Sequence, residues 1–269
     1  MHRAAAPRPV TPKAAAADGA DGAVACRVWW ARTADHRPGL EALLAPAEAV
    51  RRDLYAAEAD RRRFTVAAAL LRLAAAEFSG TGPREVEVLR DCPDCPLPHG
   101  RPRITGPLDA SVSYAGDVVL VAVAAGAVVG VDAEAPAASP RRQSAALRRA
   151  LGERESAELG RVPEAERDGW LLRRWTYKEA VLKATGEGLR VPPTAVGVSE
   201  ESGTARLTAY PGRPLGGGRT VLLPLGIPTG AMPPGGTASA AFLLDRDAPV
   251  RQAPGRYGRE LFDTDGGPG

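Results

Sequence analysis

The longest apolar run in the chain, residues Val118 to Val131, constrains the fold more than any other feature of the sequence. It reads VVLVAVAAGAVVGV and is shorter than the roughly 18 residues that suggest a membrane span. It is rich in β-branched valine, and Gly126 interrupts it with a residue suited to a tight turn. We therefore predict a buried β-hairpin, with one strand over residues 109–124 and a second over 127–135, joined at Ala125 and Gly126.

The segments on either side of this run favour an α+β fold. We expect a strand over 25–34, two helices between about 40 and 78 that break near Pro46 or Asp60, and a proline-rich loop over 92–104. Arginine-rich helices follow Pro136 and end at Gly188, and the segments after it alternate apolar and polar residues like short antiparallel strands. Gathered strands with helices laid on them are typical of α+β proteins.

The domain boundaries follow from composition and from the order of these elements. Residues 1–23 are of low complexity and residues 251–269 are rich in glycine, so we predict a disordered N-terminal tail and a flexible C-terminal tail. Between them we expect two pseudo-symmetric halves, 24–126 and 127–250. Each half would be a small, mainly antiparallel sheet packed with helices.

The balance of charge and the small number of cysteines exclude several classes of function. The 269 residues carry a formal net charge of +3, too near zero for a whole-chain electrostatic grip on nucleic acid. Three cysteines are too few for a disulfide scaffold, so we expect a cytoplasmic protein. The alanine-rich start is broken by proline, arginine, lysine and aspartate, which predicts that it is no signal peptide.

The segment WTYKEAVLKATGEGL, residues 175–189, holds two of the three lysines among the 35 basic residues of the chain. On a helix, Glu179 and Lys183 lie on one face with Trp175 a turn earlier, and Lys178 lies beside them. A carboxylate and a cation on a rigid helix could complete a metal site and meet an anionic substrate. An ordinary salt bridge four residues apart explains the same spacing, so the pattern alone does not choose.

A second pair of carboxylates comes at the end of a predicted strand. Asp132 and Glu134 are two residues apart and therefore point the same way. Two adjacent like charges repel unless a cation lies between them, and a few hard oxygen ligands suit Mg²⁺ shared with a phosphate substrate. An ordinary surface D-x-E pair is the alternative.

Taken together, GVDAE at 130–134 and WTYKEAVLKATG at 175–186 resemble the paired signature of the 4′-phosphopantetheinyl transferases, G-[IV]-D-x-E and W-x-x-K-E-A-x-x-K-x-x-G. Every fixed position matches, and the resemblance covers roughly residues 24–245. It looks most similar to the larger, monomeric, pseudo-dimeric class that serves peptide and polyketide synthases. The resemblance implies transfer of phosphopantetheine from coenzyme A to a serine of an apo acyl or peptidyl carrier protein, with release of 3′,5′-ADP and no nucleic-acid or membrane partner.

The resemblance also implies roles for individual residues. Glu179 and Lys183 would be catalytic, and Glu179 or a metal-bound water would accept the serine proton, the two routes staying open. The metal ligands for Mg²⁺ would be Asp132, Glu134 and Glu179. The coenzyme A contacts would be Arg63, Arg101, Ser113, Tyr114, Lys178 and Lys183. Tyr114 stands where the family usually has histidine, and because tyrosine carries no positive charge we expect weaker or slightly shifted nucleotide binding.

Several readings stay open beside this one. A carrier-binding module without activity, or another Mg²⁺-dependent phosphohydrolase, would use the same acids. Cys92, Cys95 and His99 could be three zinc ligands, but we interpret them as incidental thiols and an imidazole in a loop, since no fourth ligand is near in sequence. The arginine-rich stretch Arg141–Arg174 is either a docking face for an acidic carrier helix, centred on Leu151 and Leu159, or a solvated helix face.

Overall fold

The computed structural model describes residues 23–92, 94–95, 97, 99–211, 219–228, 231–245 and 248–264. The strands are β1 (Val24–Arg32), β2 (Val88–Leu89), β3 (Arg103–Ile104), β4 (Leu108–Ala115), β5 (Val118–Ala125), β6 (Val128–Glu134), β7 (Gly197–Glu201), β8 (Thr204–Ala209), β9 (Arg219–Pro224), β10 (Thr237–Leu244) and β11 (Val250–Tyr257). The helices are α1 (Pro46–Asp53), α2 (Glu58–Ser79), α3 (Pro140–Arg148), α4 (Glu153–Arg161), α5 (Arg167–Thr185) and α6 (Arg259–Thr264), with short 3-10 segments η1 to η5 between them.

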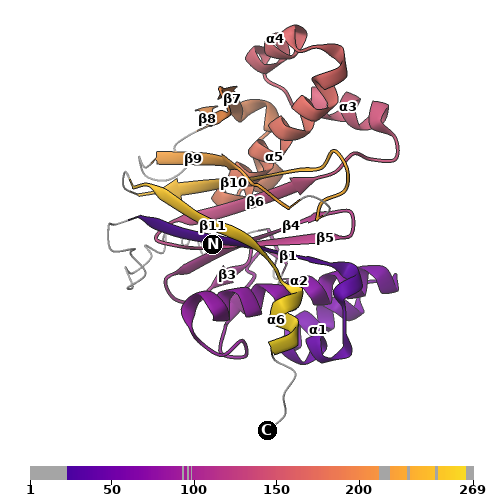
Figure 1. Ribbon diagram of the computed structural model, residues 1–269, viewed down its shortest axis with the longest axis vertical. Helices are drawn as coiled ribbons and strands as arrows, with labels where there is room; N and C mark the ends of the chain where they lie inside the picture. The colour runs from indigo at the N-terminus through magenta and orange to yellow at the C-terminus, as the bar shows by residue number, and fades with distance from the viewer. Residues whose placement is uncertain are drawn as a thin grey trace, which may run out of the picture.

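Two sheets lie in the middle of the molecule, with helices at both ends (Figure 1). The first sheet has the strand order β11-β1-β5-β4 and the second β6-β10-β9. Helix α2 packs on the first sheet, and α5 packs on β6 and β10 of the second. All pairs are antiparallel except β1 with β11, so the expected α+β class with mainly antiparallel sheets is confirmed. No helix in the described ranges is long and apolar enough to cross a membrane.

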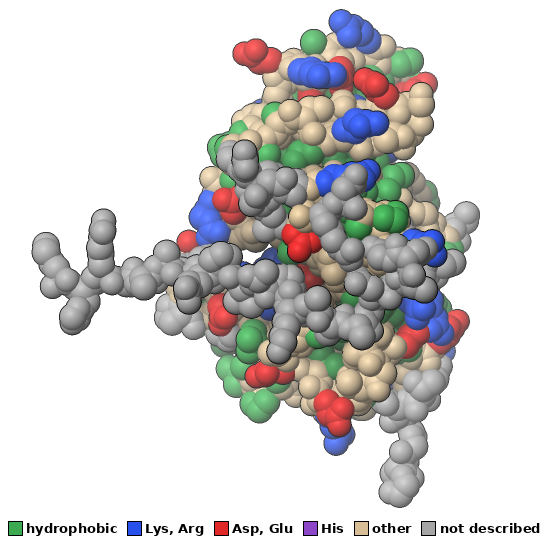
Figure 2. Space-filling view, turned by 90° about the vertical axis from the view of Figure 1, so that its left-hand side faces the viewer, with side chains coloured by type: hydrophobic (Ala, Val, Ile, Leu, Met, Phe, Trp, Pro, Cys, Tyr) green, Lys and Arg blue, Asp and Glu red, His purple; other side chains and the backbone are tan. Residues whose placement is uncertain are grey.

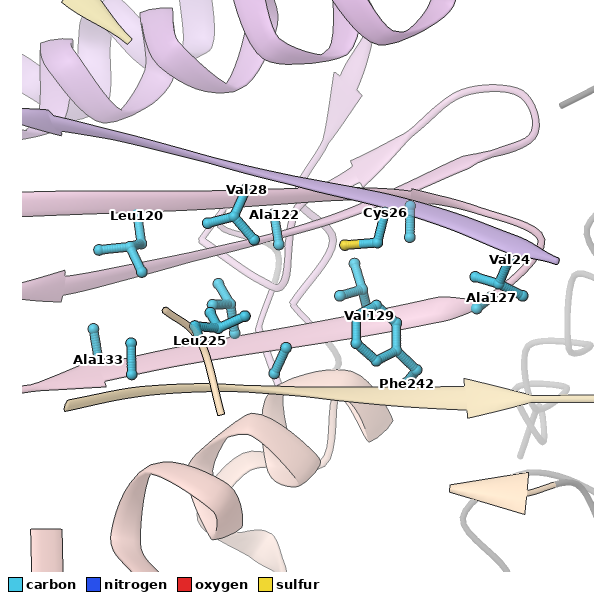
Figure 3. Close-up of a cluster of buried hydrophobic side chains, with 14 of the residues drawn as sticks. Val24, Cys26, Val28, Leu120, Ala122, Ala127, Val129, Ala133, Leu225 and Phe242 are labelled. Atoms are coloured by element: carbon cyan, nitrogen blue, oxygen red, sulfur yellow. The ribbon is translucent and has the colours of Figure 1, made fainter. Parts of the chain in front are cut away.

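The main core lies between the two sheets (Figure 3). Strand β5 is buried on both faces, since alternate residues such as Leu120 and Ala122 face this core while Val119 and Val121 face α2. A strand buried on both sides reads as a continuous apolar run rather than an alternating one. This burial explains the run with which the sequence analysis began.

The predicted hairpin at Ala125 and Gly126 is wrong. Residues 109–124 are not one strand, because Gly116, with φ 61°, turns the chain and pairs β4 with β5. The second turn, at Gly126 with φ 78°, carries the chain out of this sheet, and β6 pairs with β10 instead. Apolar residues continue through the second turn because both flanking strands line the same core, so the pattern could not show that they belong to different sheets.

The predicted C-terminal boundary is also wrong. Residues 250–257 form β11, which joins the first sheet parallel to β1, and α6 follows with Phe262 buried against the α2 core. The ring of Tyr257 stacks on Trp30 with 4.2 Å between centroids. Residues 1–22 and 265–269 of the two expected tails lie outside the described residues. A smaller correction concerns α5, which ends at a left-handed Gly186 rather than at Gly188.

Side chains of β4 join the two sheets at their edges. Both β4 and β6 are edge strands, and three alternate backbone N–H groups of β6 donate hydrogen bonds to three alternate side chains of β4. The pairs are Val129 N to Asp109 Oδ2 (2.7 Å), Val131 N to Ser111 Oγ (3.0 Å) and Ala133 N to Ser113 Oγ (3.1 Å). These bonds hold β6 in a fixed register against the first sheet.

Candidate functional site

Strand β6 and helix α5 approach each other closely at Gly130, the first residue of the GVDAE motif. A Cβ atom at this position would lie 1.9 Å from the carbonyl oxygen of Ala180 and 2.6 Å from the backbone nitrogen of Ala184. Only glycine permits such close packing. As a result, the strand face that carries Asp132 and Glu134 lies directly under one face of α5.

Three side chains of α5, spaced four residues apart, face these two acids. Trp175 Nε1 donates to Glu134 Oε1 at 2.9 Å, and Lys183 Nζ donates to Asp132 Oδ1 at 2.7 Å. Glu179 lies between them in the helix. Burial, and then the charge of Asp132, raises the pKa of the Glu179 carboxyl group, and the charge of Lys183 opposes this. The two motifs, about forty residues apart in sequence, therefore form one cluster.

Ser113 of β4 completes the cluster from the other sheet. Its hydroxyl donates to Asp132 Oδ1 at 2.9 Å and accepts from Lys183 Nζ at 2.8 Å. It also accepts the N–H of Ala133, so its orientation is fixed. Ser113 thus positions Asp132 and Lys183 in this structure, where the resemblance implied a coenzyme A contact.

The three carboxylates destabilise each other's charged forms. Burial, and then the neighbouring charge of Asp132, raises the pKa of Glu134 to about 7 and raises the pKa of Glu179. Burial also raises the pKa of Asp132, although Lys183 opposes this. Asp132 Oδ2 is buried and has no hydrogen-bond partner among the described residues. An orphaned carboxylate oxygen among three acids and a single lysine is an environment that fits a hard divalent cation such as Mg²⁺.

A group of arginines surrounds Tyr114, the residue next to Ser113. Arg63 lies over its ring at 5.5 Å and pairs with Asp60, and Arg51 and Arg90 interact with it electrostatically. Burial lowers the pKa of Arg90, whose Nε atom is buried without a partner among the described residues. Partial burial raises the pKa of Tyr114, so its hydroxyl stays protonated and able to donate. This group of arginines is suited to anions, in contrast to the carboxylate cluster.

Of these arginines, the sequence analysis named Arg63 but not Arg51 or Arg90. The chain has so many arginines that neither stands out in the sequence. They converge because α1 and the segment just after β2 both pack near the end of β4, which is a property of the tertiary fold.

The structure places Lys178 away from the site, and this corrects its predicted role in binding coenzyme A. Its side chain is fully buried and its ammonium contacts Glu155 Oε2 at 2.5 Å. It also donates to the carbonyl oxygens of Ala150 and Pro193 at 2.7 and 2.8 Å. All three donors of the ammonium are therefore used within the protein.

Arg101 is likewise committed to internal contacts rather than free for phosphate. It forms an ion pair with Asp109, and it donates to the carbonyl oxygens of Lys183 at 2.8 Å and Val129 at 2.9 Å. A forked guanidinium suits such multiple bonds. Arg101 joins the loop before β3 to the end of α5 and to β6.

Of the two alternatives for the stretch Arg141–Arg174, the docking face loses its apolar centre, because Leu151 and Leu159 are not exposed. Both leucines are buried in a small core with Trp170. Arg174 is also buried, and it stacks at 4.6 Å on the Trp170 ring and lies close to Glu158. On the face shown in Figure 2, basic and acidic side chains are interspersed over the helical end of the molecule.

Comparisons with known proteins point to one superfamily. A family model described as the 4′-phosphopantetheinyl transferase superfamily matches residues 128–215, which include β6 and α5. A protein of Synechocystis sp., slr0495, named as a candidate 4′-phosphopantetheinyl transferase, is 27% identical over 156 residues. The 4′-phosphopantetheinyl transferase HetI of Nostoc sp. is 31% identical over 150 residues.

These matches cover 56% of this chain and 61% and 62% of the two relatives, so the chain spans about three fifths of the length of the curated relatives it matches. A crystal structure of the holo-[acyl-carrier-protein] synthase of Thermotoga maritima is 22% identical, with a TM-score of 0.35 over 45% of this chain and 65% of that one. That structural likeness is too slight to carry an argument. The family model and both relatives agree with the two motifs, and residues 128–215 of this chain are similar to the 4′-phosphopantetheinyl transferase superfamily.

Proposed function

We propose that this protein transfers the 4′-phosphopantetheine group of coenzyme A to a serine of an apo acyl or peptidyl carrier protein. The observation that carries the proposal is the cluster of Asp132, Glu134, Glu179 and Lys183. In it the buried Asp132 Oδ2 has no hydrogen-bond partner among the described residues, while Oδ1 accepts a bond from Lys183. We place the reaction in the cytoplasm, which suits three free thiols, and expect a monomeric enzyme.

In this proposal Asp132, Glu134 and Glu179 would hold Mg²⁺. Bound there, Mg²⁺ would supply positive charge for the pyrophosphate oxygens of coenzyme A. Lys183 is the cation nearest to these acids among the described contacts, and 28% of its side-chain surface is exposed. It would face the same phosphates while Ser113 and Asp132 fix its position.

The transfer itself requires a proton acceptor. The serine hydroxyl oxygen forms a bond to the phosphorus of the phosphopantetheine group, and the bond from that phosphorus to the bridging oxygen breaks. The electron pair leaves with 3′,5′-ADP. Glu179, whose pKa is raised by burial and by Asp132, would accept the serine proton directly or through a water that it orients.

The arginines around Tyr114 support a site for the remaining phosphate of coenzyme A. Arg51, Arg63 and Arg90 bring positive charge to one edge of β4, while Ser113 on the same strand touches Asp132. Because neighbouring residues of a strand point to opposite faces, the two groups flank one edge strand. A nucleotide lying across this edge would reach both.

Intact mass spectrometry of an apo carrier protein tests the proposal. We expect a gain of about 340 Da on the carrier when it is incubated with this protein, coenzyme A and Mg²⁺, and no gain with EDTA. Phosphopantetheine released free of protein would favour a phosphohydrolase. Bound coenzyme A without any modification across several carrier types would favour a binding module.

A further inference from the structure

The loop between β2 and β3 brings two thiols and an imidazole together. The Sγ atoms of Cys92 and Cys95 and a ring nitrogen of His99 all lie within 4.8 Å of one another. Cys95 Sγ and His99 Nε2 are in direct contact at 2.9 Å. From the spacing C-x-x-C-x-x-x-H alone we interpreted these residues as incidental. The folded loop brings their three side chains together.

The backbone of the loop closes tightly around this cluster. Gly100 N donates to the carbonyl oxygen of Arg90 at 3.1 Å, and a Cβ atom at Gly100 would lie 1.9 Å from the carbonyl oxygen of Asp91. Gly100 follows His99 directly, and Asp91 precedes Cys92. The ends of the segment are thus held together, which forces the three side chains into one small volume.

One contact inside the loop orients Cys92. The backbone N–H of Asp94 donates to Cys92 Sγ at 3.4 Å, which holds the sulfur atom on the side of the loop that carries Cys95 and His99. The carboxylate of Asp94 does not enter the cluster, because it pairs with Arg190 at 3.0 and 3.2 Å.

We propose that Cys92, Cys95 and His99 bind one Zn²⁺ ion. Two thiolates and an imidazole are ligands that zinc prefers, and in a tetrahedral site such donors lie about 3.3 to 3.8 Å apart. The contact between Cys95 and His99 would open by less than about 1 Å to reach that spacing. The fourth position is filled by water, since His99 is exposed and both thiols are half-buried.

The site has a structural role, because the loop is joined to the helix that carries Glu179 and Lys183. Asp94 binds Arg190, just beyond the end of α5, and Arg101 binds the carbonyl oxygen of Lys183. A metal that binds Cys92, Cys95 and His99 would therefore steady Asp94 and Arg101, which both contact the same end of α5. This proposal does not depend on the proposed transfer reaction.

The test uses the full chain, purified with a reductant and titrated with Co²⁺ in place of Zn²⁺. We expect one equivalent to bind, with a thiolate-to-cobalt charge-transfer band and the intense visible bands of tetrahedral cobalt, and Zn²⁺ should displace it. Cys92→Ser and Cys95→Ser should each weaken binding at least tenfold, and His99→Asn should shift the spectrum. Native mass spectrometry should show one zinc per wild-type chain.

Matched controls separate this site from the rest of the molecule. Cys26→Ala removes the buried third thiol, His36→Asn removes another histidine, and Asp132→Asn alters the carboxylate cluster; all three should keep the cobalt spectrum. A wild-type chain that gives no charge-transfer band under reducing conditions overturns the proposal. So does a spectrum that survives both loop cysteine variants, or that Cys26→Ala abolishes while the variant remains folded.

Discussion

At the residue scale, one buried atom sets the chemistry of the site. Asp132 Oδ2 is buried and has no hydrogen-bond partner among the described residues, while Oδ1 is bound by both Lys183 and Ser113. An unpaired buried oxygen lowers the stability of the metal-free fold, and a bound cation would recover that stability. The unpaired oxygen that suits Asp132 to bind a cation therefore lowers the stability of the protein when no cation is bound.

Glu179→Gln should abolish transfer to the carrier without loss of thermal stability. The change removes a negative charge that repels Asp132, so the midpoint of thermal unfolding in EDTA should stay the same or rise slightly. In wild type, Mg²⁺ should raise the midpoint of thermal unfolding, and in this variant the rise should be absent. Glu201→Gln, at an exposed position on β7, is the control and should behave like wild type. A large loss of stability with transfer retained would make Glu179 a structural residue.

The two lysines of α5 should give opposite results when each is replaced by alanine. Lys178→Ala leaves Glu155 charged and buried, which should cost about 3 to 5 kcal/mol in the free energy of unfolding. Lys183→Ala should cost much less because its side chain is partly exposed, but it should lose transfer. Urea unfolding and the carrier assay measure both effects. A Lys178 variant that is stable yet fails to bind coenzyme A would restore its predicted role as a ligand.

Tyr114→His should tighten the binding of coenzyme A, measured by calorimetry near pH 6. A protonated imidazole adds a positive charge beside Arg63 and Arg90, where tyrosine offers only a neutral donor. Tyr114→Phe is the matched variant and should weaken binding by removing the donor. Unchanged or weaker binding with histidine would show that the phenol is itself fitted to the ligand.

The sequence could identify the four charged residues of the cluster but not every residue around them. Local periodicity places Asp132 and Glu134 on one strand face and Glu179 and Lys183 on one helix face, and the family resemblance joins the two pairs. Lys178 misled the prediction because its partner, Glu155, is 23 positions away on another helix. Its burial became visible only in the folded chain.

At the element scale, the contact between β6 and α5 determines where the acids point. The glycine of GVDAE lets the two backbones meet, and a side chain there would force strand and helix apart. The glycine of the motif is thus required for packing, while Asp132 and Glu134 of the same motif supply the carboxylates. The two turns at Gly116 and Gly126 show the limit of such local signals, since similar glycines lead in one case to a hairpin and in the other to a second sheet.

Gly130→Ala should destabilise the protein by about 3 kcal/mol, because the added methyl group meets backbone atoms that cannot rotate away. Gly160→Ala in α4 is the matched control, since nothing lies within 4 Å of a Cβ atom there. That control should be neutral or stabilising by up to about 1 kcal/mol. Chemical denaturation compares the two, and equal stability of both variants would contradict the close approach of β6 and α5.

At the scale of the whole molecule, the chain does not divide cleanly into two consecutive halves. The sheet built from residues 24–125 also includes β11, so the C-terminal end returns to the N-terminal part. The sequence could not reveal this, because the glycine and proline residues of the last segment resemble a tail and its strand pairs with one more than 200 positions earlier. Long-range pairing of this kind has no local signature.

A chain that ends at residue 249 should therefore unfold at a much lower urea concentration than the full chain. It would lose β11, which pairs with β1 at the edge of the first sheet. It would also lose the stacking of Tyr257 on Trp30 and the buried ring of Phe262. A chain that ends at Thr264 keeps every described contact and should match wild type. If both truncated chains were equally stable, β11 and α6 would be peripheral.

The row of β4 side chains that accepts the backbone N–H groups of β6 also affects whether another chain can pair with this strand. An open strand edge is a template on which another chain can add a strand and begin to aggregate. Asp109, Ser111 and Ser113 occupy that edge of β6 with side chains rather than with another backbone. Ser113, which binds Asp132 and Lys183, thus also blocks a foreign strand, so protection against aggregation and the arrangement of the carboxylate cluster depend on the same side chain.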